Sequence, residues 1–246
     1  MPNRINLFTV PNIITCFGLL CGCVGIVLAF EGATQSAMVC LLLAALLDFL
    51  DGFAARLLKA YSPVGKQLDS LADMVSFGAL PAVMLSHAVR RALGAANGAG
   101  DGAEMLLIFS PFLLTVFSAL RLAKFNVDER QSDGFLGLPT PANALFFSSA
   151  AVICMDNPLE VWALLALVGA FSFLLVCEIP MFSFKVKLGL PAKYTLPLVF
   201  VLLSGIIMLL CLLYSIPLLA AFAPIILLYI LMNVAVWIAR KFAGLR

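Results

Sequence analysis

The sequence predicts an all-α integral membrane protein with about eight transmembrane helices, from its composition, its hydropathy and the placement of its charges. Of the 246 residues, 63% are hydrophobic and only 11% are charged. Soluble globular chains carry about 25% charged residues, so this chain has too few to cover a water-facing surface. Its mean hydropathy is +1.12, and several stretches reach the roughly 20 apolar residues that a spanning helix needs.

Turns and charged segments separate the apolar stretches into individual spans. The fifth span is the shortest, and Pro217 can begin the eighth after a tight turn. The predicted spans are 12–30, 35–58, 68–89, 105–123, 141–156, 159–178, 195–214 and 217–239.

Lys and Arg are divided very unequally between the two sides of these spans. One side receives 13 of the 15, and the other receives only Arg90 and Arg91. Because cytoplasmic loops carry the excess of Lys and Arg, we expect both termini in the cytoplasm and an even number of spans. The glycine-rich stretch 94–104 is then a flexible external loop.

Four aspartates interrupt the second and third spans. Asp48 and Asp51 are three residues apart and share one helix face, and Asp69 and Asp73 are four apart and share a face of the next helix. An ionisable residue inside a span is costly and usually faces a polar interior. The connection 57–68 lets the two helices return antiparallel, so both pairs can converge near the cytoplasmic end.

Four carboxylates in one pocket repel one another unless cations neutralise them. Oxygen ligands of this kind suit Mg²⁺ or Mn²⁺, so Asp48, Asp51, Asp69 and Asp73 are predicted metal ligands. The alternative is a set of salt bridges from the aspartates to Arg56, Lys59 and Lys66 near a helix end. Four aspartates at these two spacings on adjacent helices favour a site instead.

Small residues accompany the aspartates. Gly52, Ala55 and Gly65 lie on the same faces and let a second helix or a flat ligand approach closely. Arg56 follows Gly52 by four residues and can bind phosphate or pair with a carboxylate.

These residues resemble the signature of the CDP-alcohol phosphatidyltransferases. The matching pattern is Asp48-x2-Asp51-Gly52-x2-Ala55-Arg56-x8-Gly65-x3-Asp69-x3-Asp73. The resemblance implies a membrane enzyme that moves a phosphatidyl group from a CDP-linked lipid to an alcohol and releases CMP. It implies that the first three aspartates bind metal, and that Asp73 is a metal ligand in some members and the general base. The residues expected at the nucleotide and diphosphate are Asp51, Gly52, Ala55, Arg56, Gly65, Lys66 and Asp69.

Two other stretches give evidence on the identity of the acceptor alcohol, "SALRLAKFNV" (118–127) and "GFLGLPTPANALFF" (134–147). A basic helix end followed by a proline-capped turn explains the prolines. It does not explain why Arg121, Lys124 and Asn126 cluster beside the aspartates. Arg121 and Lys124 are three residues apart and can hold an anionic group, either a lipid phosphate or a carboxylate on the acceptor.

Both stretches resemble segments of the membrane-embedded phosphatidylserine synthases, as do residues 178–187 and 11–22. Lys124 stands where that subfamily commonly has Arg, which keeps the charge but loses the two-pronged hydrogen bonding. The resemblance covers most of residues 10–190 and implies L-serine as acceptor and CDP-diacylglycerol as donor. We therefore expect one membrane domain, 1–246, with a catalytic core at 10–190 and two additional helices at 191–246.

Further candidates are Asn12, Thr15, Asn143, Lys185 and Lys187. Asn12 and Thr15 are three residues apart, and local capping or hydrogen bonding also explains them. Lys185 and Lys187 can bind the serine carboxylate in place of Arg121 or Lys124.

Two alternatives remain open at this point. The acceptor can be another alcohol, such as glycerol 3-phosphate or an inositol phosphate, or the carboxylates can line a cation- or proton-coupled transport path. A transport path should place polar residues near the bilayer midplane across several spans, whereas this acidic cluster is confined to one end of two helices. The resemblance also implies a homodimer. From the distribution of Lys and Arg we expect the active site on the cytoplasmic side, in the bacterial inner membrane, and we expect no nucleic-acid partner.

Overall fold

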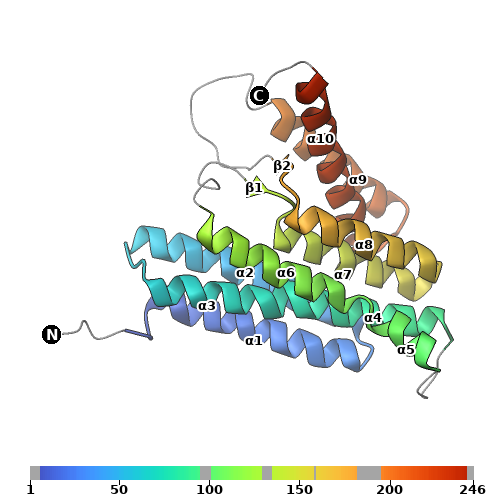
Figure 1. Ribbon diagram of the computed structural model, residues 1–246, viewed down its shortest axis with the longest axis horizontal. Coiled ribbons are helices and arrows are strands. Elements are labelled where there is room, and N and C mark those ends of the chain that lie inside the picture. Colours follow the sequence, from blue (N-terminus) through green and yellow to red (C-terminus); the bar gives the residue numbers. More distant parts are fainter. Residues whose placement is uncertain (1–5, 95–100, 129–134, 158, 182–194, 243–246) are drawn as a thin grey trace.

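The computed structural model describes residues 6–94, 101–128, 135–157, 159–181 and 195–242. Helices dominate it, and most of them lie side by side in one elongated bundle (Figure 1). The helices, in chain order, are α1 (Val10–Phe30), α2 (Thr34–Leu57), α3 (Pro63–Asp73), η1 (Met74–Ala79), α4 (Leu80–Ala92), α5 (Gly102–Phe109), α6 (Phe112–Val127), α7 (Thr140–Asp156), α8 (Val161–Val176), α9 (Thr195–Leu213), η4 (Leu218–Ala221) and α10 (Phe222–Phe242).

The third predicted span is one continuous helical rod made of α3, the π-helical segment η1 and α4. It begins at Pro63, five residues before the predicted start at 68. Ser62 caps the rod, because its Oγ accepts a hydrogen bond of 2.9 Å from the Gly65 amide. Pro63 occupies the first helical position, where its missing N–H costs nothing. The π-helix follows Asp73 directly.

The fourth predicted span is two helices instead of one. α5 ends at Phe109 and α6 begins at Phe112, with Pro111 between them. Proline has no N–H to continue the helix and its ring clashes with the preceding turn, which accounts for the break. α6 then extends to Val127, four residues beyond the predicted end.

Two short strands pair beside the ends of these helices: β1 lies between α6 and α7, and β2 follows α8. β1 (Phe135–Leu136) pairs antiparallel with β2 (Pro180–Met181), with Phe135 opposite Met181. Gly137 follows β1 with φ of +79°, and a β-carbon there would lie 2.8 Å from the carbonyl oxygens of Leu175 and Cys177. Only glycine fits this close approach between the start of α7 and the end of α8.

The apolar core lies between α2, α4 and α7. Met38, Leu41, Leu85 and Phe147 are fully buried there. Phe146 stacks on Phe171 of α8 with ring centroids 4.2 Å apart, so the core continues from α7 to α8.

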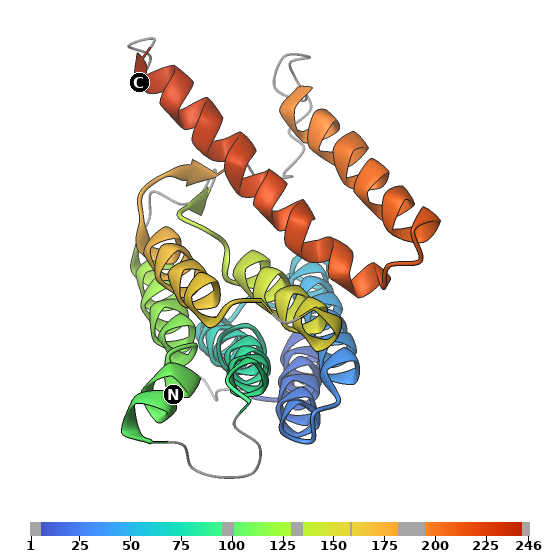
Figure 2. The same ribbon diagram turned by 90° about the vertical axis from the view of Figure 1, so that its right-hand side faces the viewer.

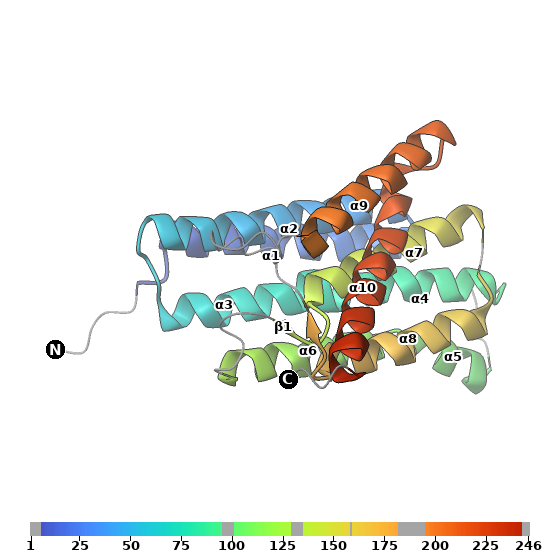
Figure 3. The ribbon, with the colours of Figure 1, turned by 90° about the horizontal axis from the view of Figure 1, so that it is seen from above.

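The last two helices do not follow the bundle. Viewed along the bundle, α9 and α10 lie on one side of it and are inclined to its helices (Figure 2), and from above α10 runs nearly perpendicular to its long axis (Figure 3). α10 packs against α7, and the Ala223 amide donates a 3.0 Å hydrogen bond to Ser149 Oγ of α7. Two helices are thus present in the segment 191–246, and the division of the chain into a catalytic core and two additional helices stays a prediction.

The described helices support an all-α membrane protein. Six of them, counting α3–α4 and α5–α6 as one each, are long and apolar enough to cross a membrane: 10–30, 34–57, 63–92, 102–127, 196–213 and 218–242. α7 and α8 coincide with the fifth and sixth predicted spans but have only 17 and 16 residues. The number of eight spans and the orientation of the termini stay predictions.

Candidate active site

The antiparallel return of α2 and α3 brings the aspartates together, as expected. The two helices are joined by residues 58–62, in which Lys59 adopts a φ of +52°. Ligand oxygens of Asp48, Asp51 and Asp69 lie within 4.8 Å of one another. Asp73, one turn along from Asp69, lines the same small inner hollow as these three carboxylates.

None of the four aspartates forms an ion pair with Arg56, Lys59 or Lys66 in the described part of the chain. The salt-bridge alternative is therefore wrong for this structure. Three close carboxylates without a neutralising side chain suit a divalent cation, which prefers hard oxygen ligands. Asp48, Asp51 and Asp69 can thus hold a metal ion.

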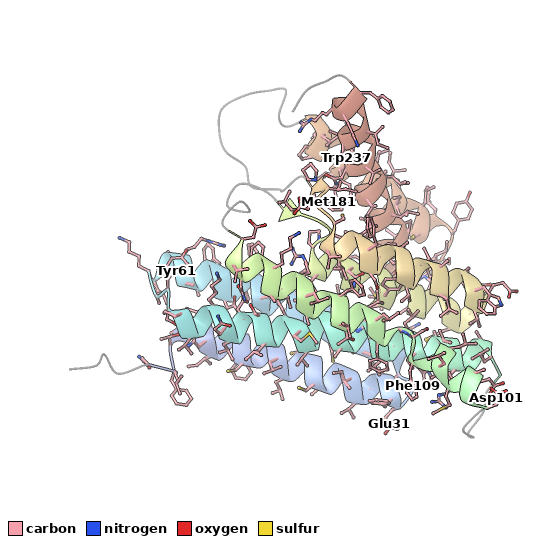
Figure 4. All side chains as sticks on the ribbon, in the orientation of Figure 1. Glu31, Tyr61, Asp101, Phe109, Met181 and Trp237 are labelled. Atoms are coloured by element: carbon pink, nitrogen blue, oxygen red, sulfur yellow. The ribbon has the colours of Figure 1, made fainter. Side chains whose placement is uncertain are left out.

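A larger cavity leads from the aspartates to one end of the bundle. Its volume is about 520 Å³. Tyr61 lies at the end of the bundle where the cavity opens, and Glu31 and Asp101 lie at the opposite end (Figure 4). The lining residues are Pro11, Asn12, Thr15, Asp51, Gly52, Ala55, Ala60, Tyr61, Ser62, Pro63, Gly65, Lys66 and Asp69.

Helix α1 closes one wall of this cavity. Thr15 Oγ1 donates a 2.5 Å hydrogen bond to Asp51 Oδ2, and the same hydroxyl lies 3.0 Å from the Pro11 carbonyl oxygen. Asn12 Nδ2 donates to the Leu7 carbonyl, and its Oδ1 lies 3.0 Å from where a β-carbon on Gly65 would be. The local interpretation of Asn12 and Thr15 is therefore incomplete, because both side chains also meet the signature residues.

The small signature residues allow this close packing. Gly52 and Ala55 line the cavity, and the absent Gly65 side chain leaves room for Asn12. Arg56 is exposed, and its Nη1 lies 3.8 Å from the β-carbon position of Gly52. Its guanidinium thus lies beside the cavity.

Lys66 and Asn126 connect α3 to α6. Lys66 Nζ donates to the Asn126 carbonyl at 2.9 Å, and Asn126 Nδ2 donates to Ser70 Oγ at 2.8 Å. Lys66 also lines the cavity. Asn126 is therefore connected to the cavity indirectly, through its hydrogen bonds with Lys66 and Ser70 of α3.

Arg121 and Lys124 point to different places. Arg121 is 6% exposed, donates from Nη1 to Thr140 Oγ1 at 3.1 Å, and interacts electrostatically with Asp73. Lys124 Nζ instead donates to the Val176 carbonyl and pairs with Glu178 at 3.4 Å. The charge of Arg121 is therefore within electrostatic reach of the fourth aspartate, whereas Lys124 is paired with Glu178.

The remaining candidates have mixed outcomes. Asn143 is fully buried on α7, one turn beyond Thr140. Lys185 and Lys187 lie outside the described residues.

Several polar residues at the site were not singled out in the sequence. Ser76 lines the inner hollow, and its hydroxyl lies 3.3 Å from the Gly18 carbonyl. Thr140 holds Arg121, and Tyr61 and Ser62 line the cavity mouth. The one available signal was proximity to a motif, since Thr140 lies within "GLPTPANA" and Tyr61 and Ser62 lie within the signature.

The matching region of a family model decides the assignment. The CDP-alcohol phosphatidyltransferase model matches residues 8–174, which contain every aspartate of the site. This chain belongs to the CDP-alcohol phosphatidyltransferase family. In this phosphatidyltransferase the matched region ends inside α8, so β2, α9 and α10 lie beyond it.

Curated relatives of this phosphatidyltransferase carry consistent names. A CDP-diacylglycerol–serine O-phosphatidyltransferase of Mycobacterium bovis is 32% identical over 211 residues, covering 80% of this chain and 69% of the relative. One from Bacillus subtilis is 32% identical, covering 72% of this chain and 91% of the relative. An archaetidylserine synthase of Methanothermobacter thermautotrophicus is 32% identical, covering 58% of each chain.

Proposed function

We propose that this protein transfers the phosphatidyl group of CDP-diacylglycerol to L-serine and releases CMP. The observation that carries the proposal is the cluster of Asp48, Asp51 and Asp69 at the inner end of an open cavity, with Asp73 beside it. The names of the relatives support serine as the acceptor.

The cavity suits the CDP headgroup. Asp48, Asp51 and Asp69 would hold the divalent cation, Mg²⁺ or Mn²⁺, that the family resemblance implies. When bound, such a cation offsets the charge of the diphosphate and stabilises charge on the transferred phosphoryl group. Gly52, Ala55 and Gly65 leave the cavity wall open to a close ligand, while Arg56 and Lys66 add positive charge beside it.

Asp73 is proposed as the general base. The serine hydroxyl oxygen forms a bond to the phosphatidyl phosphorus, its proton passes to the Asp73 carboxylate, and CMP leaves with the electron pair of the broken P–O bond. Arg121 is proposed to bind the serine carboxylate, because it is a buried cation within electrostatic reach of Asp73. Lys124 has its own carboxylate partner, Glu178, and is the second candidate, followed by Lys185 and Lys187.

The membrane arrangement follows from the charges. We propose that the bundle crosses the bacterial inner membrane with the aspartate end and both termini in the cytoplasm. The water-soluble CMP then leaves into the cytoplasm while the acyl chains stay in the bilayer. We further propose a catalytic core at 10–190, two additional helices at 191–246, and a homodimer.

The experiment is to measure CMP release by the purified protein from CDP-diacylglycerol with Mg²⁺ or Mn²⁺. Serine, glycerol 3-phosphate and inositol are supplied separately, and Asp73→Asn is the control. Serine-dependent release that disappears in the variant supports the proposal. Release with a different alcohol would keep the family chemistry and replace the acceptor. If no alcohol supports CMP release, the transport hypothesis is favoured instead.

A further inference from the structure

Asn143 has an unusual environment. Its side chain is 0% exposed, and neither Oδ1 nor Nδ2 forms a hydrogen bond within the described part of the chain. Buried amides almost always have hydrogen-bond partners, because losing water without replacement is costly. Both atoms of the Asn143 amide therefore have their hydrogen-bonding capacity available to a bound ligand.

Its position indicates where such a ligand would lie. Asn143 follows Thr140 by three residues on α7, and Thr140 holds the guanidinium of Arg121. Helix geometry puts residues three apart on one face, about 4.5 Å apart along the axis. Asn143 therefore lies one turn further into the bundle than the proposed carboxylate-binding arginine.

The facing helix α6 repeats the pattern. Ser118 precedes Arg121 by three residues, is 0% exposed, and its hydroxyl also has no hydrogen-bond partner within the described residues. Its β-carbon lies 3.4 Å from where a β-carbon on Gly78 would be, just beyond Asp73 on the α3–η1–α4 rod. Since α6 and α7 run in opposite directions, Ser118 and Asn143 lie at a similar depth.

We propose that Asn143 binds the ammonium group of the acceptor through Oδ1 and thereby selects an amino alcohol. This inference rests on the proposed function and names a specificity-determining residue for it. Serine carries an ammonium next to its carboxylate, so a carboxylate held by Arg121 places the ammonium within a few ångströms. Nδ2 then faces the carboxylate as a second donor. Glycerol 3-phosphate and inositol have no ammonium and would leave the amide oxygen unsatisfied.

A purely structural role predicts the opposite stability effect. If the amide held the fold together, Asn143→Leu would destabilise the protein. Since the amide has no partner in the described structure, an apolar side chain of similar size should leave the melting temperature unchanged or raise it. Stability and acceptor affinity therefore separate the two roles.

The experiment compares Asn143→Leu with the wild type and with Ser149→Ala, a matched change of a buried polar residue on the same helix. Ser149 accepts the Ala223 amide, so its variant should lose stability and keep the wild-type KM for serine. Asn143→Leu should raise the KM for serine at least about tenfold, with the KM for CDP-diacylglycerol and the melting temperature preserved. It should also reduce the preference for serine over 3-hydroxypropionate, which lacks the ammonium.

Each outcome decides a different statement. A wild-type protein that releases no CMP with serine overturns the proposed function. Serine-dependent wild-type activity with an unchanged serine KM in Asn143→Leu overturns only the role of Asn143. A lowered melting temperature together with weaker use of both substrates would assign Asn143 to the fold and overturn the inference as well.

Discussion

Thr15 of α1 donates a hydrogen bond to Asp51 of α2, and the two residues are 36 positions apart in the sequence. Both side chains are buried, at 6% and 7% exposure. The bond engages Oδ2 of a residue that also lines the cavity. Groups that orient a metal ligand in this way often matter almost as much as the ligand itself.

Thr15→Val should weaken Mn²⁺ binding about 10- to 100-fold, the usual effect of losing such an orienting partner. Valine keeps the shape of threonine and removes only the hydroxyl. The measurement is a Mn²⁺ titration of the purified protein followed by electron paramagnetic resonance, which needs no substrate.

Thr15→Ser serves as the control, because it retains the hydroxyl and should bind Mn²⁺ nearly as the wild type does. Equal Mn²⁺ affinity in the valine variant would show that the carboxylate keeps its position without Thr15.

Gly22→Ala should destabilise the protein by about 1–3 kcal/mol through overpacking. A β-carbon at Gly22 would overlap Ser76 Oγ and lie 3.0 Å from Ser76 Cα, which is backbone. Thermal unfolding in detergent measures the effect. Gly169→Ala is the matched change in another helix, where nothing lies within 4 Å; it should be neutral or stabilise by up to about 1 kcal/mol. Equal melting temperatures for the two variants would mean that α1 can move away from η1.

Gly137→Ala should raise the KM for serine as well as lower stability. The added methyl would meet the carbonyls of Leu175 and Cys177, and the displaced segment carries Thr140, the partner of Arg121. Steady-state kinetics with serine and with CDP-diacylglycerol varied separately would check it. Gly94→Ala is the control, since Gly94 also has a positive φ (+66°) but no atom within 4 Å. The prediction is wrong if both variants change the serine KM equally.

Arg121→Ala should raise the KM for serine about 10- to 100-fold, because a hydrogen-bonded buried charge contributes roughly 1.5–3 kcal/mol. Lys124→Ala should change it less than about fivefold, since its pair with Glu178 has side chains 32% and 61% exposed and exposed pairs contribute about 0–1 kcal/mol. Both variants are compared at matched folded fractions. A larger effect at Lys124 would exchange the two assignments.

The local rules of helices account for what the sequence could predict. Asp48, Asp51, Asp69 and Asp73 are at fixed spacings on two helices joined by a short turn, so their convergence follows from periodicity and connectivity. The start of α3 was misplaced, although Ser62 and Pro63 carry a capping signal that was available.

Contacts between distant segments account for what it could not. Thr15 lies on an apolar helix and has a local hydrogen-bond partner, the Pro11 carbonyl oxygen. Nothing in the neighbouring sequence points to Asp51. Arg121 and Lys124 share a helix face, yet the Lys124 side chain extends to the Val176 carbonyl at the end of α8, while the Arg121 guanidinium donates a hydrogen bond to Thr140. The direction of α9 and α10 depends on packing against α7, which hydropathy does not report.

The π-helical segment Met74–Ala79 makes this region tolerant of one particular change in chain length. A π turn contains one residue more than an α turn, so deleting a single residue there would let the rod become a regular α-helix. Because the π turn absorbs that extra residue, the helix beyond the deletion would keep its orientation relative to Asp69 and Asp73, and Leu80 and Leu85 would stay in the core. The same deletion within α4 would instead rotate everything beyond it by roughly 100° and would separate the register of the site from that of the core.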